Sequence, residues 1–107
     1  AGALAAAYEA LGGDVVYAGK PHLPIYELAE RMVRDGLGRD VARDRLLAIG
    51  DGLNTDIAGA AAAGLRSVFV ASGLHVEGRR LSAEVVSELF SDVPKPWPIA
   101  ALDALKW

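Results

Sequence analysis

The chain has 107 residues, of which 52% are hydrophobic, and a formal net charge of −3. This apolar fraction predicts a packed core rather than a disordered chain, and the length suits one domain or part of one. The charge balance argues against a nucleic-acid partner, because there is no excess of lysine and arginine to neutralise phosphates. The lack of cysteine excludes a disulfide scaffold and a cysteine-ligated zinc site, and it fits a reducing, cytoplasmic environment.

The sequence carries no signal for a membrane anchor or for secretion. No apolar stretch approaches the ~20 residues that a membrane span requires. The apolar N-terminus is not preceded by the basic residues of a signal peptide. We therefore expect no membrane partner. Because the chain begins at Ala1 with the pattern of a helix already in progress, we expect it to be a piece of a longer protein.

The first half of the chain alternates predicted helices with a short predicted strand. Apolar residues at helical spacing predict a helix over 4–11, which Gly12–Gly13 end. The β-branched and aromatic residues of 14–18 predict a strand. Pro24 suits the first turn of a second helix that runs to about residue 35. Its predicted apolar face comprises Ile25, Leu28, Ala29, Met32 and Val33.

The second half continues the alternation. The unbroken apolar run over 45–49 predicts a buried parallel strand, followed by a short helix over 55–63. A further strand is predicted over 66–71, then a helix of about ten residues capped by Ser82. A short edge strand is expected within 99–105. Such alternation with short connections predicts an α/β fold with a mainly parallel sheet.

Two carboxylates flank a glycine-rich turn after the predicted strand 45–49. Asp51 follows the strand directly, and Asp56 begins the next helix, which Asn54 or Thr55 would cap. In open α/β sheets ligands bind beyond the carboxyl ends of the strands, and two carboxylates there suit Mg²⁺. Alternatively, Asp51 belongs to an ordinary turn and Asp56 complements the helix dipole. The spacing alone does not decide between these interpretations.

Lys20 holds the corresponding position one αβ unit earlier, directly after the predicted strand 14–18. The two loops would then open on the same edge of the sheet. A fixed ammonium beside two carboxylates is what phosphoryl transfer requires, because it offsets charge on a nucleophile and on the transferred phosphate. The alternative is a solvated loop lysine. Two histidines, His22 and His75, are expected on the same edge, either to touch a substrate or to have no functional role.

Three segments, in this order and separation, resemble the back half of the haloacid dehalogenase (HAD) superfamily: Gly19–Glu27, Ile49–Gly64 and Ser72–His75. The resemblance is greatest to the class IIA branch of sugar-phosphate, nucleotide and aryl-phosphate phosphatases. It implies a partial three-layer, Rossmann-like α/β fold. Residues 1–13 would end the cap domain or return from it, and residues 14–107 would form the C-terminal half of the core. The family's nucleophile strand, which ends in Asp-x-Asp, and nearly all of the cap have no counterpart here.

The resemblance also implies roles for the motif residues. Lys20 matches the lysine that steadies the nucleophile and the phosphate, and Asp51 matches a carboxylate ligand of Mg²⁺. Asp56 matches the second carboxylate, which supports the metal and its waters. We therefore predict Lys20 and Asp56 as catalytic residues and Asp51 and Asp56 as metal ligands. Substrate binding is predicted for Lys20, His22 and Asn54.

The function implied by the resemblance is that of a Mg²⁺-dependent phosphate-monoester hydrolase that acts through an aspartyl-phosphate. Its substrate would be a small sugar, nucleotide or aryl phosphate. The chain alone is expected to be inactive, because it lacks the nucleophile. The alternative is a non-catalytic HAD-like module for binding or assembly, against which the intact set Lys20, Asp51 and Asp56 argues. Without the nucleophile strand, the strand at 46–49 would have an open apolar edge, which favours aggregation or pairing. A homo-oligomer is one of the partners that we consider.

Overall fold

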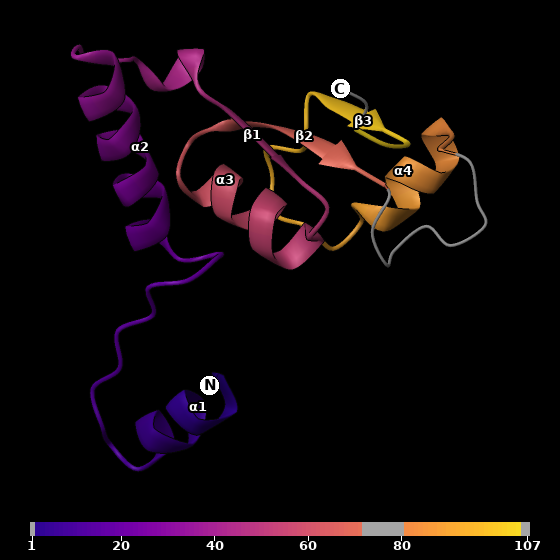
Figure 1. The fold of residues 1–107 in the computed structure, drawn as a ribbon. Helices are drawn as coiled ribbons and strands as arrows, with labels where there is room; N and C mark the ends of the chain where they lie inside the picture. Colours follow the sequence, from indigo (N-terminus) through magenta and orange to yellow (C-terminus); the bar gives the residue numbers. More distant parts are fainter. Residues whose placement is uncertain (1, 72–80, 106–107) are drawn as a thin grey trace.

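A computed structural model describes residues 2–71 and 81–105 of the chain (Figure 1). Apart from the strand expected over 14–18, its elements follow the predicted alternation of helices and strands. In chain order they are α1 (Gly2–Ala10), α2 (Leu23–Leu37), β1 (Leu47–Gly50), α3 (Ala58–Ala62), β2 (Arg66–Val70), α4 (Ala83–Leu89) and β3 (Ala100–Leu102). A 3-10 turn, Arg43–Arg45, precedes β1, and a π-helical turn, Leu53–Ile57, leads into α3.

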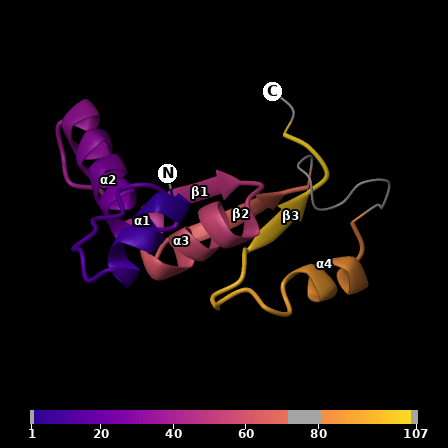
Figure 2. The same cartoon turned by 90° about the horizontal axis from the view of Figure 1, so that it is seen from below.

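The three strands form one parallel sheet in the order β1-β2-β3. Ile49 of β1 is level with Val68 of β2, which is level with Ala100 of β3. Figure 2 shows the strands side by side, with α3 lying along them and α4 beyond β3. The predicted parallel α/β architecture is therefore confirmed. Because all strands run the same way, the residues that follow β1 lie at the carboxyl edge, where ligands of such sheets bind.

The main core surrounds Phe69 of β2. Phe69 and Phe90 are almost fully buried, and their rings meet edge to face with centroids 5.3 Å apart. Ile57, which is also fully buried, joins the same cluster from the turn before α3. Ser82 caps α4 as predicted, since its Oγ accepts a hydrogen bond from Val85 N at 3.3 Å. This cluster joins α4 and the turn before α3 to the central strand.

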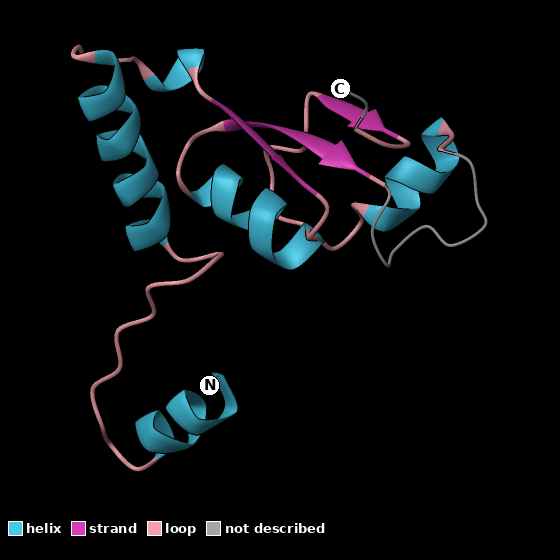
Figure 3. Cartoon of the chain, viewed as in Figure 1, coloured by secondary structure: helices cyan, strands magenta, loops and turns pink. Residues whose placement is uncertain are grey.

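A second cluster joins α2 to α3. Tyr26 of α2 packs with Ala60, Ala63 and Leu65. Helix α2 has Pro24 in its first turn, as predicted, and ends at Gly38, whose φ of 63° is left-handed. The contact places the beginning of α2 beside the turn that follows β1 (Figure 3). No helix in 2–71 or 81–105 is long and apolar enough to span a membrane.

The predicted strand over 14–18 is wrong. The segment is extended without secondary structure, and Val16 is 87% exposed. A β-branched run favours a strand only where another strand completes the hydrogen bonds, and no strand in the described part of the chain pairs with this segment. Figure 1 shows the segment leading from α1, which stands apart from the sheet, to α2.

The strand predicted over 45–49 is present as β1 but is not buried. Leu47 and Ile49 are 48% and 49% exposed, because β1 lies at an edge of the sheet. The strand begins at Leu47 rather than Arg45, since Arg43–Arg45 form the 3-10 turn. The expectation of an open apolar edge on this strand is met in the described part of the chain.

Candidate active site

The carboxyl end of β1 turns sharply into the helix that follows. Asp51 comes directly after the strand, and Asp56 lies in the π-helical turn Leu53–Ile57. Gly52 N donates a hydrogen bond to Asp56 Oδ2 at 3.1 Å. The predicted caps, Asn54 and Thr55, are wrong: the turn begins after Gly52 without a side-chain cap. The Asp56 carboxylate instead satisfies the Gly52 amide, so the acid itself holds the loop closed.

Both glycines of this loop are required for steric reasons. A Cβ on Gly50 would overlap the side chain of Asp56, and a Cβ on Gly52 would overlap the Thr55 hydroxyl. A residue without a side chain therefore allows the backbone to approach Asp56 closely. This close approach explains why glycine occupies both positions of the Gly-Asp-Gly pattern at the end of the strand.

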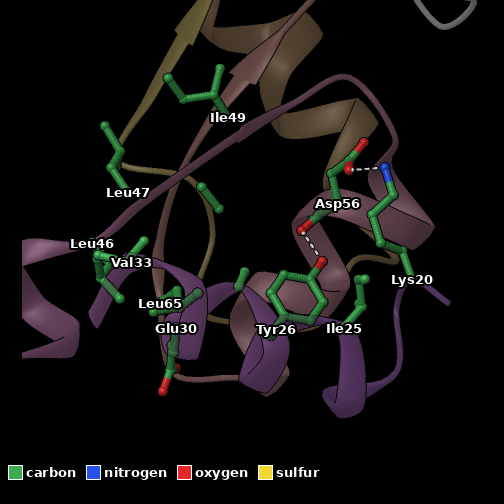
Figure 4. Close-up of a pocket in the computed structure, with 12 residues that line it drawn as sticks. Lys20, Ile25, Tyr26, Glu30, Val33, Leu46, Leu47, Ile49, Asp56 and Leu65 are labelled. Atoms are coloured by element: carbon green, nitrogen blue, oxygen red, sulfur yellow. Dashed lines mark hydrogen bonds and ion pairs between the residues drawn. The ribbon is translucent and has the colours of Figure 1, made fainter. Parts of the chain in front are cut away.

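Lys20 reaches the same carboxylate from the loop before α2. Its Nζ lies 2.6 Å from Asp56 Oδ1, although the two residues are 36 positions apart. The hydrogen bond and the charge of Asp56 raise the pKa of Lys20, and the more distant charge of Asp51 adds to the effect. The fold thus brings Lys20, Asp51 and Asp56 to one corner of the sheet, and Figure 4 shows the first and last of these joined. The ammonium is held beside a carboxylate and stays partly exposed to solvent.

Tyr26 is a site residue that the sequence did not single out. Its Oη lies 3.1 Å from the carbonyl oxygens of both Thr55 and Asp56. Burial raises the pKa of Tyr26, and the charge of Asp56 raises it further. The predicted apolar face of this helix included Met32, which is instead 65% exposed, and left out Tyr26, which is buried. The buried face of α2 is therefore rotated from the predicted one, and the Tyr26 ring lies against Gly59 of α3.

The other predicted site residues lie apart from the Lys20–Asp56 pair. The His22 ring stacks on Tyr17, with centroids 4.7 Å apart, just before α2 begins. Asn54 is exposed on the turn that carries Asp56. Neither side chain is joined to the Lys20–Asp56 pair by a hydrogen bond within 2–71 and 81–105. His75 lies outside the described residues.

A cavity of about 310 Å³ extends from this corner between α2 and the edge strand β1. Lys20 and Asp56 supply its charged end, as Figure 4 shows. Its other walls are mainly apolar and include Val33, Leu46 and Ile49. The site therefore opens onto an apolar surface rather than onto a wholly polar cleft.

The carboxylates offer the type of ligand that Mg²⁺ prefers. Mg²⁺ is commonly bound through one or two carboxylates, with waters and substrate phosphate completing its shell. Both oxygens of Asp56 already accept contacts, from Lys20 and from Gly52 N. Asp51 accepts no hydrogen bond from the described residues, so it is the more available ligand. The donors fit Mg²⁺, but no group of three or more acidic or histidine side chains in the described part could hold a metal.

Comparison with known proteins identifies the family. The model of the HAD-hydrolase-like family matches residues 17–93, which include the Lys20, Asp51 and Asp56 motifs. The chain belongs to this family. A sequence search of the curated proteins found no match.

Solved structures agree with this assignment. A haloacid dehalogenase-like hydrolase from Brucella suis is 39% identical over 98% of the chain, with a TM-score of 0.69. A possible sugar phosphatase from Cytophaga hutchinsonii is 25% identical over 99%, with a TM-score of 0.64. A p-nitrophenyl phosphatase from Archaeoglobus fulgidus is 24% identical over 96%, with a TM-score of 0.65, and shares the fold. The chain spans 36%, 35% and 35% of the lengths of these proteins, respectively. The fold is thus a partial HAD-like α/β fold.

Proposed function

We propose that this chain is the C-terminal part of a Mg²⁺-dependent phosphate-monoester hydrolase of HAD class IIA. The observation that carries the proposal is the 2.6 Å pair between Lys20 and Asp56, with Asp51 beside it at the end of β1. The described residues at this corner provide an ammonium and two carboxylates but no further metal ligands. A complete site therefore needs groups from elsewhere, and we expect the chain alone to be inactive.

The contacts support the roles that we assign. Lys20 offsets negative charge on the attacking carboxylate and on the transferred phosphate, since its ammonium is fixed at the carboxyl edge. Asp56 holds that ammonium in place and closes the loop through Gly52 N. Asp51 is the ligand that would hold Mg²⁺, with Asp56 supporting the metal's waters. When bound, Mg²⁺ supplies positive charge that shields and orients the phosphate oxygens.

The nucleophile in this proposal is an aspartate outside the present chain. Its carboxylate attacks the phosphorus of a monoester as the bond from phosphorus to the ester oxygen breaks, and that oxygen takes a proton from a general acid, also outside the present chain, to leave as the alcohol. Water then hydrolyses the aspartyl-phosphate and releases inorganic phosphate. The substrate class is a small sugar, nucleotide or aryl phosphate, as the class IIA resemblance implies, and the similarity to the possible sugar phosphatase from Cytophaga supports the sugar phosphate. The cysteine-free composition supports a cytoplasmic location.

The test uses the full-length protein that contains this chain, assayed with p-nitrophenyl phosphate and MgCl₂. We expect Mg²⁺-dependent turnover that Asp51→Asn and Lys20→Met each reduce at least about 100-fold. Asp51→Asn removes the carboxylate that would hold Mg²⁺, and Lys20→Met removes the positive charge that offsets the transferred phosphate. The matched controls are Asp92→Asn and Lys95→Met. Asp92 is exposed and Lys95 lies over the Trp97 ring, so both variants should keep turnover within about twofold.

Two results would count against the proposal. One is full-length turnover that survives both Asp51→Asn and Lys20→Met. The other is turnover by the isolated chain that Asp51→Asn abolishes, since the chain would then contain its own nucleophile.

A further inference from the structure

Tyr26 joins the beginning of α2 to the turn that carries Asp56. Its hydroxyl lies 3.1 Å from both the Thr55 and the Asp56 carbonyl oxygens, so its single proton is donated to one of them or shared. The side chain is buried, so water does not readily replace these contacts. Figure 4 shows the ring beneath Asp56, with the hydroxyl directed at the Asp56 backbone.

The start of α2 thus holds Asp56 at two points. Lys20, three residues before the helix, contacts the carboxylate, while Tyr26, in the first turns of the helix, contacts the backbone. The two contacts come from one short stretch of chain. Any movement of the Tyr26 contact therefore changes the position of the carboxylate relative to the Lys20 ammonium.

Packing fixes the ring as well as the hydroxyl. A Cβ on Gly59 would overlap the Tyr26 ring, so the ring can pack against α3 only because position 59 is glycine. Ala60 and Leu65 complete the cluster around it. These contacts alone could hold the ring, but the hydroxyl also lies against the turn that carries Asp56.

We propose that Tyr26 is a positioning residue: its hydroxyl, seated by Gly59, fixes the Leu53–Ile57 turn so that Asp56 holds Lys20 in its working place. This inference rests on the proposed function and adds a residue to it. A misplacement of catalytic groups by about 1 Å can cost up to about 100-fold in rate, so a single hydroxyl can act from outside the reaction centre. Tyr26 itself does not touch the reacting atoms.

The first test is independent of enzymatic activity. In the full-length protein, hydrogen exchange of the Gly52 amide, measured by NMR, reports the position of the Asp56 carboxylate, because this amide donates to Asp56 Oδ2. We expect Tyr26→Phe to accelerate exchange at Gly52 about tenfold, while exchange at Phe69 in β2 changes less than about twofold. Tyr8→Phe, which removes a hydroxyl from an exposed ring, is the matched control and should change neither.

The second test separates positioning from packing in the full-length protein. We expect Tyr26→Phe to lower kcat about tenfold and to leave KM within about twofold, because substrate binding does not use the hydroxyl. Leu65→Ala loosens the same cluster without removing the hydroxyl. It should lower the melting temperature more than Tyr26→Phe does and reduce kcat less.

The decisive comparison keeps the shape of the ring. 4-Aminophenylalanine and 4-methylphenylalanine at position 26 fill similar space, but only the former has a donor, so they also serve if Tyr26→Phe does not fold. Recovery of Gly52 protection and of kcat by the amino variant alone would support the proposal. Equal behaviour of the two would overturn it and leave Tyr26 a packing residue. If the unmodified full-length protein hydrolyses no phosphate ester, the proposed function fails, whereas the exchange comparison still tests the role of Tyr26.

Discussion

The core around β2 and the N-terminal region both contain apolar residues, but in very different surroundings. Around β2, Phe69 and Phe90 are 1% and 0% exposed. In the N-terminal region, α1 has no buried residue, and Val16 in the following segment is 87% exposed. Apolar side chains stabilise a fold only to the extent that they leave water, so the stability of the described structure is concentrated near β2. The N-terminal segment has the residues of a core without the neighbours that would make one.

The candidate site lies between these two regions. The turn that holds Asp56 is anchored on the core side by buried Ile57. Lys20 comes from the loop at the end of the exposed N-terminal segment. The comparison therefore teaches that the carboxylates are placed by the core, whereas the lysine is placed by its contact with Asp56 and by the start of α2.

The largest expected effect concerns the core. Phe90→Ala should lower the free energy of unfolding by about 3–5 kcal/mol, because it leaves a cavity beside Phe69. Val16→Ala should change it by no more than about 0.5 kcal/mol, because the side chain is already in water. Urea unfolding followed by circular dichroism measures both. Similar losses for the two variants would show that residues 14–18 belong to the cooperative core after all.

A smaller effect is expected at the site. The raised pKa of Lys20 means that its pair with Asp56 stabilises the folded chain below the ordinary value of 10.5. That contribution is lost as the pH rises through the higher folded-state value. Because Lys20 is 51% exposed, solvent screens the pair, and we expect about 0.5 kcal/mol.

The measurement is the difference in unfolding free energy between the unmodified chain and Lys20→Met, at pH 8 and at pH 11. We expect the unmodified chain to be the more stable at pH 8 and the difference to shrink at pH 11. A difference that does not change with pH would mean that the side chain acts through packing of its methylene groups rather than through its charge.

Much of the fold could be predicted because local and global signals agree. The run before Gly50 and the one before Ala71 form parallel strands, and Ser82 caps a helix as expected. The strand over 14–18 was not predictable, because a strand depends on a partner that local pattern does not report. The prediction that β1 is buried was wrong for the same reason. An apolar run indicates that a strand prefers a core, but it does not indicate which strand lies at the edge of the sheet.

The site divides in the same way. Lys20 and Asp56 were expected together because each was predicted to follow a strand of one parallel sheet. The structure joins them, although residues 14–18 before Lys20 form no strand. Tyr26 could not be predicted, because its role depends on the rotation of α2 and on contact with Gly59 across the fold. A side chain that contacts backbone carbonyls needs no particular residue type at the other position, so no sequence motif reveals the contact.

The central claim is that Asp51 and Asp56 support a nucleophile that lies outside this chain. The most direct measurement is to trap the covalent intermediate of the full-length protein with a phosphate ester, reduce it with borohydride and locate the modified residue by mass spectrometry. We expect the modification on an aspartate outside the 107 residues, and none on Asp51 or Asp56. A modification on either of these two residues would contradict the account, because the chain would then carry the nucleophile itself.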